Sequence, residues 1–153
     1  MPPRPLRADS VGPVLARQDV ALRCVAPVGV GAAAAAGALY VRAVDPARGG
    51  AFPSCPFHRL TGWWCPGCGM TRGLHHLLTG NFAGALASNL FLPIVIVLGG
   101  WLWLAWLWPS MTGRRLTGLQ RVPDGAWIAV AALAVIYGVL RNVPFAPFDA
   151  LAP

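Results

Sequence analysis

The chain has 153 residues, of which 56% are hydrophobic and 11% are charged. Soluble domains usually have about 25% charged residues, so this composition argues against a water-soluble globular protein and indicates a lipid environment. The formal net charge of +7 comes from single arginines at the ends of apolar segments, where they anchor head groups and set topology. We therefore expect the lipid bilayer as a partner and no nucleic acid.

An uncharged run over residues 24–41 follows an N-terminal stretch with several prolines and arginines. We expect a flexible tail over residues 1–20, because this stretch has no sustained apolar period. The run covers about 27 Å as a helix, close to the ~30 Å core of a bilayer, and predicts a first span. It is longer than the ~7–15 apolar residues of a signal peptide, which is the alternative. The spacing of Gly29, Ala33 and Gly37 favours close packing with another helix.

Two further apolar segments predict a second span over residues 90–108 and a third over residues 126–143. Prolines after the third segment end it and leave a C-terminal tail over residues 146–153. The sequence therefore predicts an all-α integral membrane protein with about three transmembrane helices. We expect these helices to form a single membrane domain over residues 21–145.

The segment between the first two spans contains a cysteine-rich loop over residues 53–81, which ends at the turn residues Gly80 and Asn81. Residues 71–78 and 82–89 have helical composition, but both pieces are too short to cross a bilayer. We expect them to form short helices that lie on the membrane surface or re-enter it, beside an interfacial loop.

Arginine counts favour one orientation of the three predicted spans. Seven arginines lie on the side of the N-terminal tail, and five lie on the side of the cysteine-rich loop. Because positively charged residues are retained on the cytoplasmic side, we expect a multi-pass protein of the cell membrane with a cytoplasmic N-terminus. The cysteine-rich loop then faces outward.

Three of the four cysteines and all three histidines lie within residues 55–76. Cys65 and Cys68 form a C-x-x-C step with proline and glycine between them, a turn that directs backbone N–H groups at the sulfurs and suits Zn²⁺ or iron. Cys55 supplies a third sulfur. The predicted fourth ligand is a histidine. His75 is preferred, and His58 or His76 are the alternatives.

The same cysteines are also compatible with other chemistry. Cys65 and Cys68 precede a predicted helix, whose N-terminal dipole would stabilise a thiolate for thiol–disulfide exchange, with Cys55 as a resolving thiol. A structural disulfide and simple packing of small side chains stay open as well. The sequence shows no acid–base pair, nucleotide-binding glycine loop or serine–histidine–carboxylate set, so we expect a binding or scaffold module rather than an enzyme.

Four polar residues near this segment are candidate binding residues. Arg72, which follows Thr71 at the start of the predicted helix, is costly at membrane depth unless it is paired or hydrated, and a lipid phosphate is one suitable partner. Arg141 and Asn142 end the third span on the same side and can meet the cysteine-rich loop. Extension of Arg141 to the membrane interface is the alternative.

A longer pattern, C-P-(x)n-T-G-x-x-C-P-G-C-G-x-T-R, runs from Cys55 to Arg72. It resembles a bacterial family of small membrane proteins of unknown function, over roughly residues 50–145. The similarity extends to a later asparagine and a closing Arg-Asn-x-Pro, which are here Asn89, Arg141, Asn142 and Pro144. The resemblance implies a membrane protein of two or three helices and lends no activity or ligand.

These observations lead to one main hypothesis and two rivals. The main hypothesis is a metal-stabilised loop that docks another membrane protein or a lipid head group through Arg72. The first rival is a membrane thiol–disulfide oxidoreductase that uses Cys65 and Cys68. The second is an accessory subunit of a larger membrane complex, which the small-residue face of the first span favours.

Overall fold

A computed structural model describes residues 12–114, 123–146 and 148–151. Within these ranges every regular element is helical, so the predicted all-α class is confirmed. The α-helices and 3₁₀-helices are α1 (Gly12–Ala43), η2 (Pro46–Arg48), α2 (Pro56–Thr61), α3 (Met70–Leu78), α4 (Phe82–Ser88), α5 (Leu92–Thr112), α6 (Asp124–Leu140) and η3 (Phe148–Leu151).

Two helices in the described residues are long and apolar enough to cross a membrane: Val20–Ala43 within α1, and Leu92–Thr112, which is α5. Only 11% and 6% of their most apolar windows are buried, whereas the core helix of a soluble protein would be mostly buried. The two helices therefore suggest membrane association. Helix α6 is apolar but shorter, so the third span stays a prediction.

Helix α6 covers Asp124–Leu140, slightly displaced from the predicted 126–143, and larger differences from the predicted boundaries occur elsewhere. Helix α1 begins at Gly12, so residues 12–20 of the predicted tail are helical, and residues 1–11 lie outside the described residues. Helix α5 continues past Pro109 for one more turn, although an internal proline removes a hydrogen bond and crowds the preceding turn, and it is capped by Gly113 with a φ of 67°. A 3₁₀ turn, η3, lies in the predicted C-terminal tail.

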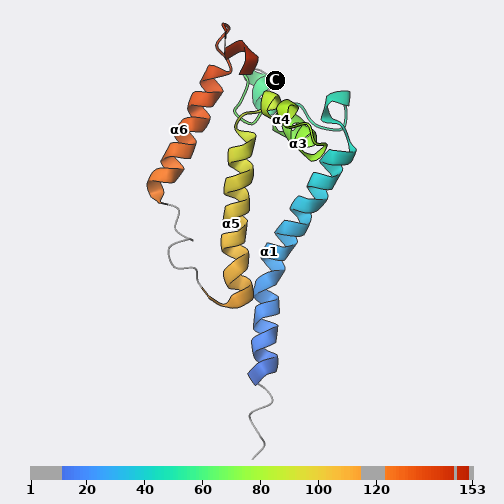
Figure 1. Ribbon diagram of the computed structural model, residues 1–153, viewed down its shortest axis with the longest axis vertical. Coiled ribbons are helices and arrows are strands. Elements are labelled where there is room, and N and C mark those ends of the chain that lie inside the picture. The colour runs from blue at the N-terminus through green and yellow to red at the C-terminus, as the bar shows by residue number, and fades with distance from the viewer. Residues whose placement is uncertain (1–11, 115–122, 147, 152–153) are drawn as a thin grey trace, which may run out of the picture.

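The three long helices meet the short ones at one end of the molecule (Figure 1). Helices α1 and α5 pack against each other, α3 packs against α4 and α1, and α6 reaches the same end through its C-terminal turn. Tyr137 in that turn accepts a hydrogen bond at its hydroxyl from Leu90 N, at 3.1 Å, and its ring stacks on Phe91. The cysteine segment therefore lies where all these helices converge.

Helices α1 and α5 meet at Gly31, where a Cβ atom would lie 2.6 Å from the ring of Trp103. Trp103 also donates its indole N–H to Pro27 O, at 2.9 Å. The predicted packing face was wrong for contacts within this chain, because a Cβ on Gly29 or Gly37 would meet nothing within 4 Å. The helices meet at Gly31 because the large indole of Trp103 leaves no room there for a side chain.

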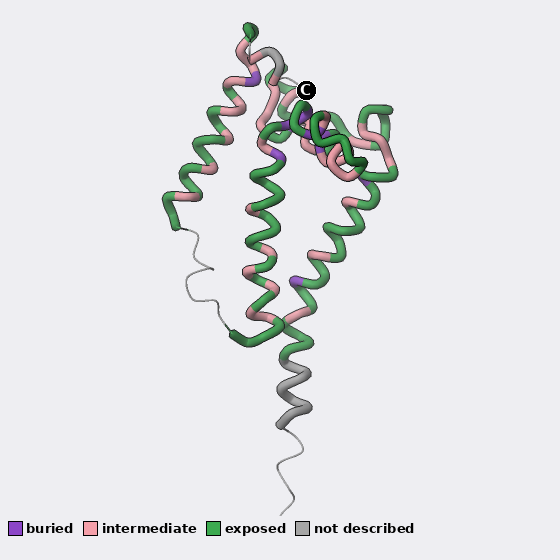
Figure 2. Tube along the Cα trace, in the orientation of Figure 1, coloured by how far each residue is buried: buried purple, intermediate pink, exposed green. Residues whose placement is uncertain are grey.

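Buried residues concentrate at the cysteine end, and the long helices are mostly exposed (Figure 2). The least exposed side chains there include Asn89 and Arg141, which are 1% and 2% exposed. The exposed side chains of α1, α5 and α6 include many valines, leucines, isoleucines and tryptophans. An apolar outer surface of this kind matches the hydrocarbon of a bilayer.

Gly73 in α3 allows the close approach of α4 and α5. A Cβ at this buried position would lie 3.1 Å from Ala85 O and 3.1 Å from Leu92 Cδ2. Because one of these atoms is backbone, the neighbouring helices would have to move to make room. The absence of a side chain at Gly73 thus fixes the place of α3, which begins directly after the cysteine turn.

We expect Gly73→Leu to destabilise the protein by about 1–3 kcal/mol, because an added side chain overpacks the junction of the three helices. Thermal unfolding in mild detergent measures the effect. Gly37→Leu is the matched control, since a Cβ at Gly37 meets nothing within 4 Å. Equal unfolding temperatures for the two variants would contradict this packing.

Candidate metal centre

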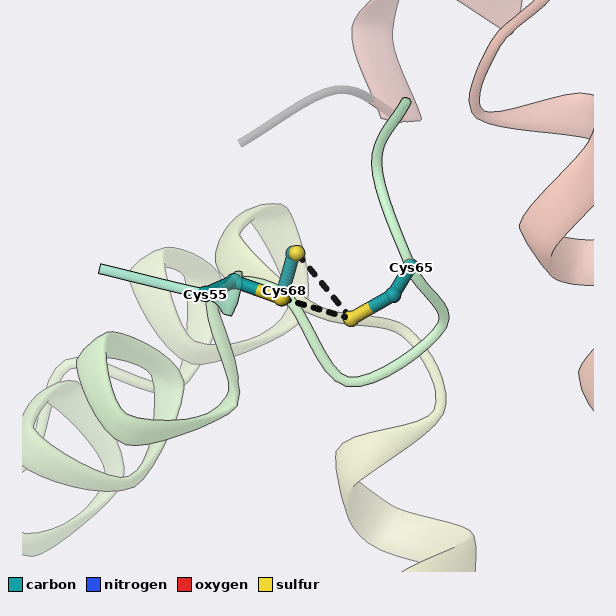
Figure 3. Close-up of side chains that lie close together, drawn as sticks. All are labelled: Cys55, Cys65 and Cys68. Carbon is teal, nitrogen blue, oxygen red and sulfur yellow. Dashed lines mark hydrogen bonds between the residues drawn. The ribbon is translucent and has the colours of Figure 1, made fainter. Parts of the chain in front are cut away.

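Three cysteine sulfurs lie together at the converging end of the helices (Figure 3). Cys65 Sγ is 3.0 Å from Cys68 Sγ and 3.5 Å from Cys55 Sγ, and all three sulfurs lie within 4.8 Å of one another. Cys68 is buried, while the other two are half-buried. Thiolates are preferred ligands of Zn²⁺ and of iron in iron–sulfur clusters, so this set could hold a metal ion.

Two turns in the local sequence bring the sulfurs together. Cys55 immediately precedes α2, which has Pro56 in its first turn. A tight turn links Cys65 O to Cys68 N, at 3.0 Å, and Gly69 then adopts a φ of 81° to begin α3. A left-handed conformation of this kind favours glycine. The C-x-x-C step is thus a turn before a helix, as the sequence predicts.

Two buried polar side chains donate hydrogen bonds to the backbone of the cysteine turn, residues 65–68. Asn89 Nδ2 donates to Pro66 O at 2.8 Å and to Cys68 O at 3.0 Å. Arg141 Nη1 donates to Cys68 O at 2.8 Å and to Cys65 O at 3.2 Å. Three carbonyl groups of the turn are therefore bound by buried side chains from the C-terminal ends of α4 and α6.

Asn142 fixes the residue before the turn. Its Oδ1 accepts from Trp64 N at 2.8 Å, and its Nδ2 donates to Trp64 O at 2.9 Å and to Gly138 O at 2.7 Å. Pro66 also packs closely on Gly138, where a Cβ would lie 3.3 Å from Pro66 Cδ. The C-terminal turn of α6 is thus attached to the cysteine segment across more than 70 residues of sequence.

The environments of two thiols shift their pKa values in opposite directions. The backbone N–H of His58, at the start of α2, lowers the pKa of Cys55 below its usual value. Burial, assisted by hydrogen bonds from the other two cysteines, raises the pKa of Cys68 to about 12. Cys68 is therefore a neutral thiol at pH 7 unless a cation replaces its proton, as a bound metal ion does.

Arg141 brings a buried positive charge beneath these thiols. Its guanidinium lies 5.1 Å from the ring centroid of Tyr137, and its Nε and Nη2 atoms are buried without a hydrogen-bond partner among the described residues. The one ion pair found within the described residues joins Arg48 to Asp45 instead. A buried cation of this kind is costly unless a negative charge lies nearby.

The three histidines are all described, and none has a ring nitrogen in the sulfur group. His75 Nδ1 lies 2.8 Å from Val41 O at the end of α1, and His76 contacts the edge of the His75 ring. His58 stacks on Trp64 with ring centroids 3.7 Å apart, and its Nδ1 is buried without a partner. A histidine as the fourth ligand stays a prediction.

Thr71 and Arg72 are exposed in the first turn of α3. Both line a groove of about 540 Å³ that Cys55 and Cys68 also line. The predicted binding residues therefore form two groups. Thr71 and Arg72 line the groove at the surface, whereas Arg141 and Asn142 contact the backbone of residues 64–68. The sequence assigned no role to Asn89, and its place in the resembled family pattern was the only signal.

Residues 55–103 match a family model that is described as Protein of unknown function (DUF2752). The match begins at the first clustered cysteine and ends within α5. The expected resemblance to a family of unknown function is thus confirmed for this part of the chain. No curated protein and no solved structure matches the sequence, so the site chemistry alone indicates what the chain can do.

Proposed function

We propose that the protein is an integral membrane protein in which Cys55, Cys65 and Cys68 bind one thiophilic metal ion, Zn²⁺ or iron. The metal holds the loop in the shape that docks a membrane partner or a lipid head group through Arg72. The observation that supports this proposal is the convergence of three sulfurs within 4.8 Å. The metal ion replaces the protons of the three thiols, because a cysteine binds a metal through its deprotonated sulfur.

The third cysteine favours a metal over a disulfide. A structural disulfide between Cys65 and Cys68 would use two sulfurs and leave out Cys55 Sγ, which lies 3.5 Å from Cys65 Sγ. Burial also makes Cys68 a poor nucleophile, since it raises the pKa of this thiol to about 12. A metal ion uses all three sulfurs and replaces their protons.

A membrane thiol–disulfide oxidoreductase is the second candidate function. The closest pair of sulfurs, Cys65 and Cys68 at 3.0 Å, supports it, because these two thiols would need little movement to form a disulfide. The metal experiment below separates the two functions.

The proposed membrane arrangement has three spans, with α6 as the third and a single membrane domain over residues 21–145. Arg141 and Asn142 support this arrangement, because they attach the end of α6 to the cysteine segment. All three long helices then have one end on the side of the molecule where α3 and α4 lie (Figure 1). The arginine distribution favours a cytoplasmic N-terminus and an outward-facing loop.

We expect the protein, purified without air in mild detergent, to bind one Co²⁺ or Zn²⁺ ion per chain. Co²⁺ bound to three thiolates absorbs strongly in the near ultraviolet, so absorbance counts the sulfur ligands while elemental analysis counts the metal. Cys65→Ser should abolish tight binding, because it removes the sulfur that contacts both others.

Cys24→Ser is the matched control, since this half-buried cysteine in α1 lies outside the sulfur group. It should retain full metal binding. A protein that contains no metal and two fewer free thiols than its reduced form would reject the metal site and favour the oxidoreductase or a structural disulfide.

A further inference from the structure

A groove of about 540 Å³ opens beside two of the three clustered sulfurs. Cys55 and Cys68 line it, together with His58, Thr71 and Arg72. Its remaining lining is glycine, proline, serine and aromatic residues, and no carboxylate is found among the described residues that line it. The polar lining of the groove is thus neutral or positively charged.

The protein supplies three sulfur ligands, whereas Zn²⁺ and Co²⁺ in such sites take at least four. No histidine nitrogen lies in the sulfur group, and His75 is held by Val41 O at the end of α1. Metal sites with three protein ligands keep their fourth position for water or an exchangeable ligand. Because Cys55 and Cys68 face the groove, a ligand that enters the groove can reach this position.

The charges around the site select the kind of ligand. Arg72 is exposed at the groove, and Arg141 is buried beneath the cysteine turn with Nε and Nη2 unpartnered. One guanidinium group at the groove and one bound to the backbone of Cys65 and Cys68 favour an additional negative charge at the metal. Thr71 adds a hydroxyl donor at the same rim.

We propose that the groove binds a small anionic thiol, whose sulfur completes the coordination of the metal and whose second negative group pairs with Arg72. The thiol loses its proton to solvent as its sulfur binds, and no electron is transferred. This inference rests on the proposed metal site and names the ligand class that the site takes. Arg72 is thereby the residue that selects a negatively charged ligand over a neutral one.

The test uses the full-length protein loaded with Co²⁺ and two probes that differ in charge, 2-mercaptoethanesulfonate and 2-mercaptoethanol. Each probe should shift the visible cobalt spectrum as water is replaced by sulfur. We expect the sulfonate to bind about fivefold more tightly to the wild type, which is typical of a partly exposed ion pair. Arg72→Gln should bind the two thiols equally.

Arg59→Gln is the matched control, because Arg59 is exposed on α2 and does not line the groove. It should keep the preference for the sulfonate. In the wild type, raising the salt concentration should reduce this preference as well, because salt screens an exposed ion pair. This second measurement stays available if Arg72→Gln does not fold.

Three outcomes would overturn the proposal. A cobalt spectrum that neither thiol changes shows that a protein group, such as His58, completes the site, and the metal-binding proposal then survives alone. Equal binding of both thiols by the wild type removes the role of Arg72. A protein that binds no Co²⁺ rejects both the metal site and its ligand.

Discussion

Replacing Arg141 with methionine is expected to weaken Zn²⁺ binding by about 10- to 100-fold, the usual effect of removing a group that supports metal ligands. Arg141 Nη1 donates to the carbonyls of Cys65 and Cys68, and so holds the turn that carries both sulfurs. Zn²⁺ with three thiolates has a net charge of −1. The buried guanidinium, which is 2% exposed, stabilises this charge at close range.

The effect on the metal-free protein should be much smaller. Without metal, Cys68 is a neutral thiol because burial raises its pKa to about 12, and Arg141 then has two buried nitrogens without a partner. Methionine removes the cost of this buried charge while it forfeits the two hydrogen bonds, and these effects oppose each other. Arg141 therefore contributes mainly to the metal-bound state.

Competition against a chromophoric chelator in mild detergent measures the Zn²⁺ affinity of each variant. Arg59→Met, at an exposed position on α2, should match the wild type. Arg141→Lys should give an intermediate affinity, because it keeps the charge but presents a less rigid donor. An unchanged affinity for Arg141→Met would contradict the electrostatic role that we assign to the guanidinium.

Replacing Asn89 with leucine is expected to destabilise the protein by about 2–6 kcal/mol, since two backbone groups lose their partner and each such loss costs ~1–3 kcal/mol. Asn89 Nδ2 donates to Pro66 O and Cys68 O, and its Oδ1 accepts from Phe91 N at 2.8 Å. Leucine has a similar volume but leaves Pro66 O and Phe91 N without their partners, whereas Cys68 O keeps its bond from Arg141 Nη1. We expect an apparent melting temperature at least about 5 °C lower.

Asn81→Leu provides the comparison for this substitution. Asn81 is exposed and its Oδ1 accepts a single bond, from Gly84 N at 2.8 Å, as the cap of α4. Loss of a helix cap costs about 1 kcal/mol, so this variant should unfold only slightly earlier than the wild type. If both variants melted together, the three hydrogen bonds of Asn89 would not be a main support of the cysteine turn.

The helices were predictable because their signals are local. Uncharged runs of spanning length are visible in the sequence as α1 and α5, and the turn at Gly80 and Asn81 separates α3 from α4 as expected. Helix α2 was missed, although a proline at its first position, Pro56, and a glycine just after its end, Gly62, are common helix boundaries. Its six residues are too few to show an apolar period.

The supports of the candidate site were harder to predict. The C-x-x-C step and Cys55 are recognisable as candidate sulfur ligands, because metal-binding chemistry depends on residue type and spacing. The contacts of Arg141 and Asn89 with this turn join positions far apart in the chain, and no sequence period encodes such a pair. His75 illustrates the same limit, since its Nδ1 meets Val41 O in the fold.

The attachment of Arg141 and Asn142 to residues 64–68 has a mechanical consequence under the proposed topology. Any change in the tilt of α6 displaces the backbone that carries Cys65 and Cys68. Tilt depends on bilayer thickness, and Zn–S bonds tolerate little variation around ~2.3 Å. Metal occupancy and bilayer thickness are therefore thermodynamically linked, so that binding of the ion also favours one inclination of the helix.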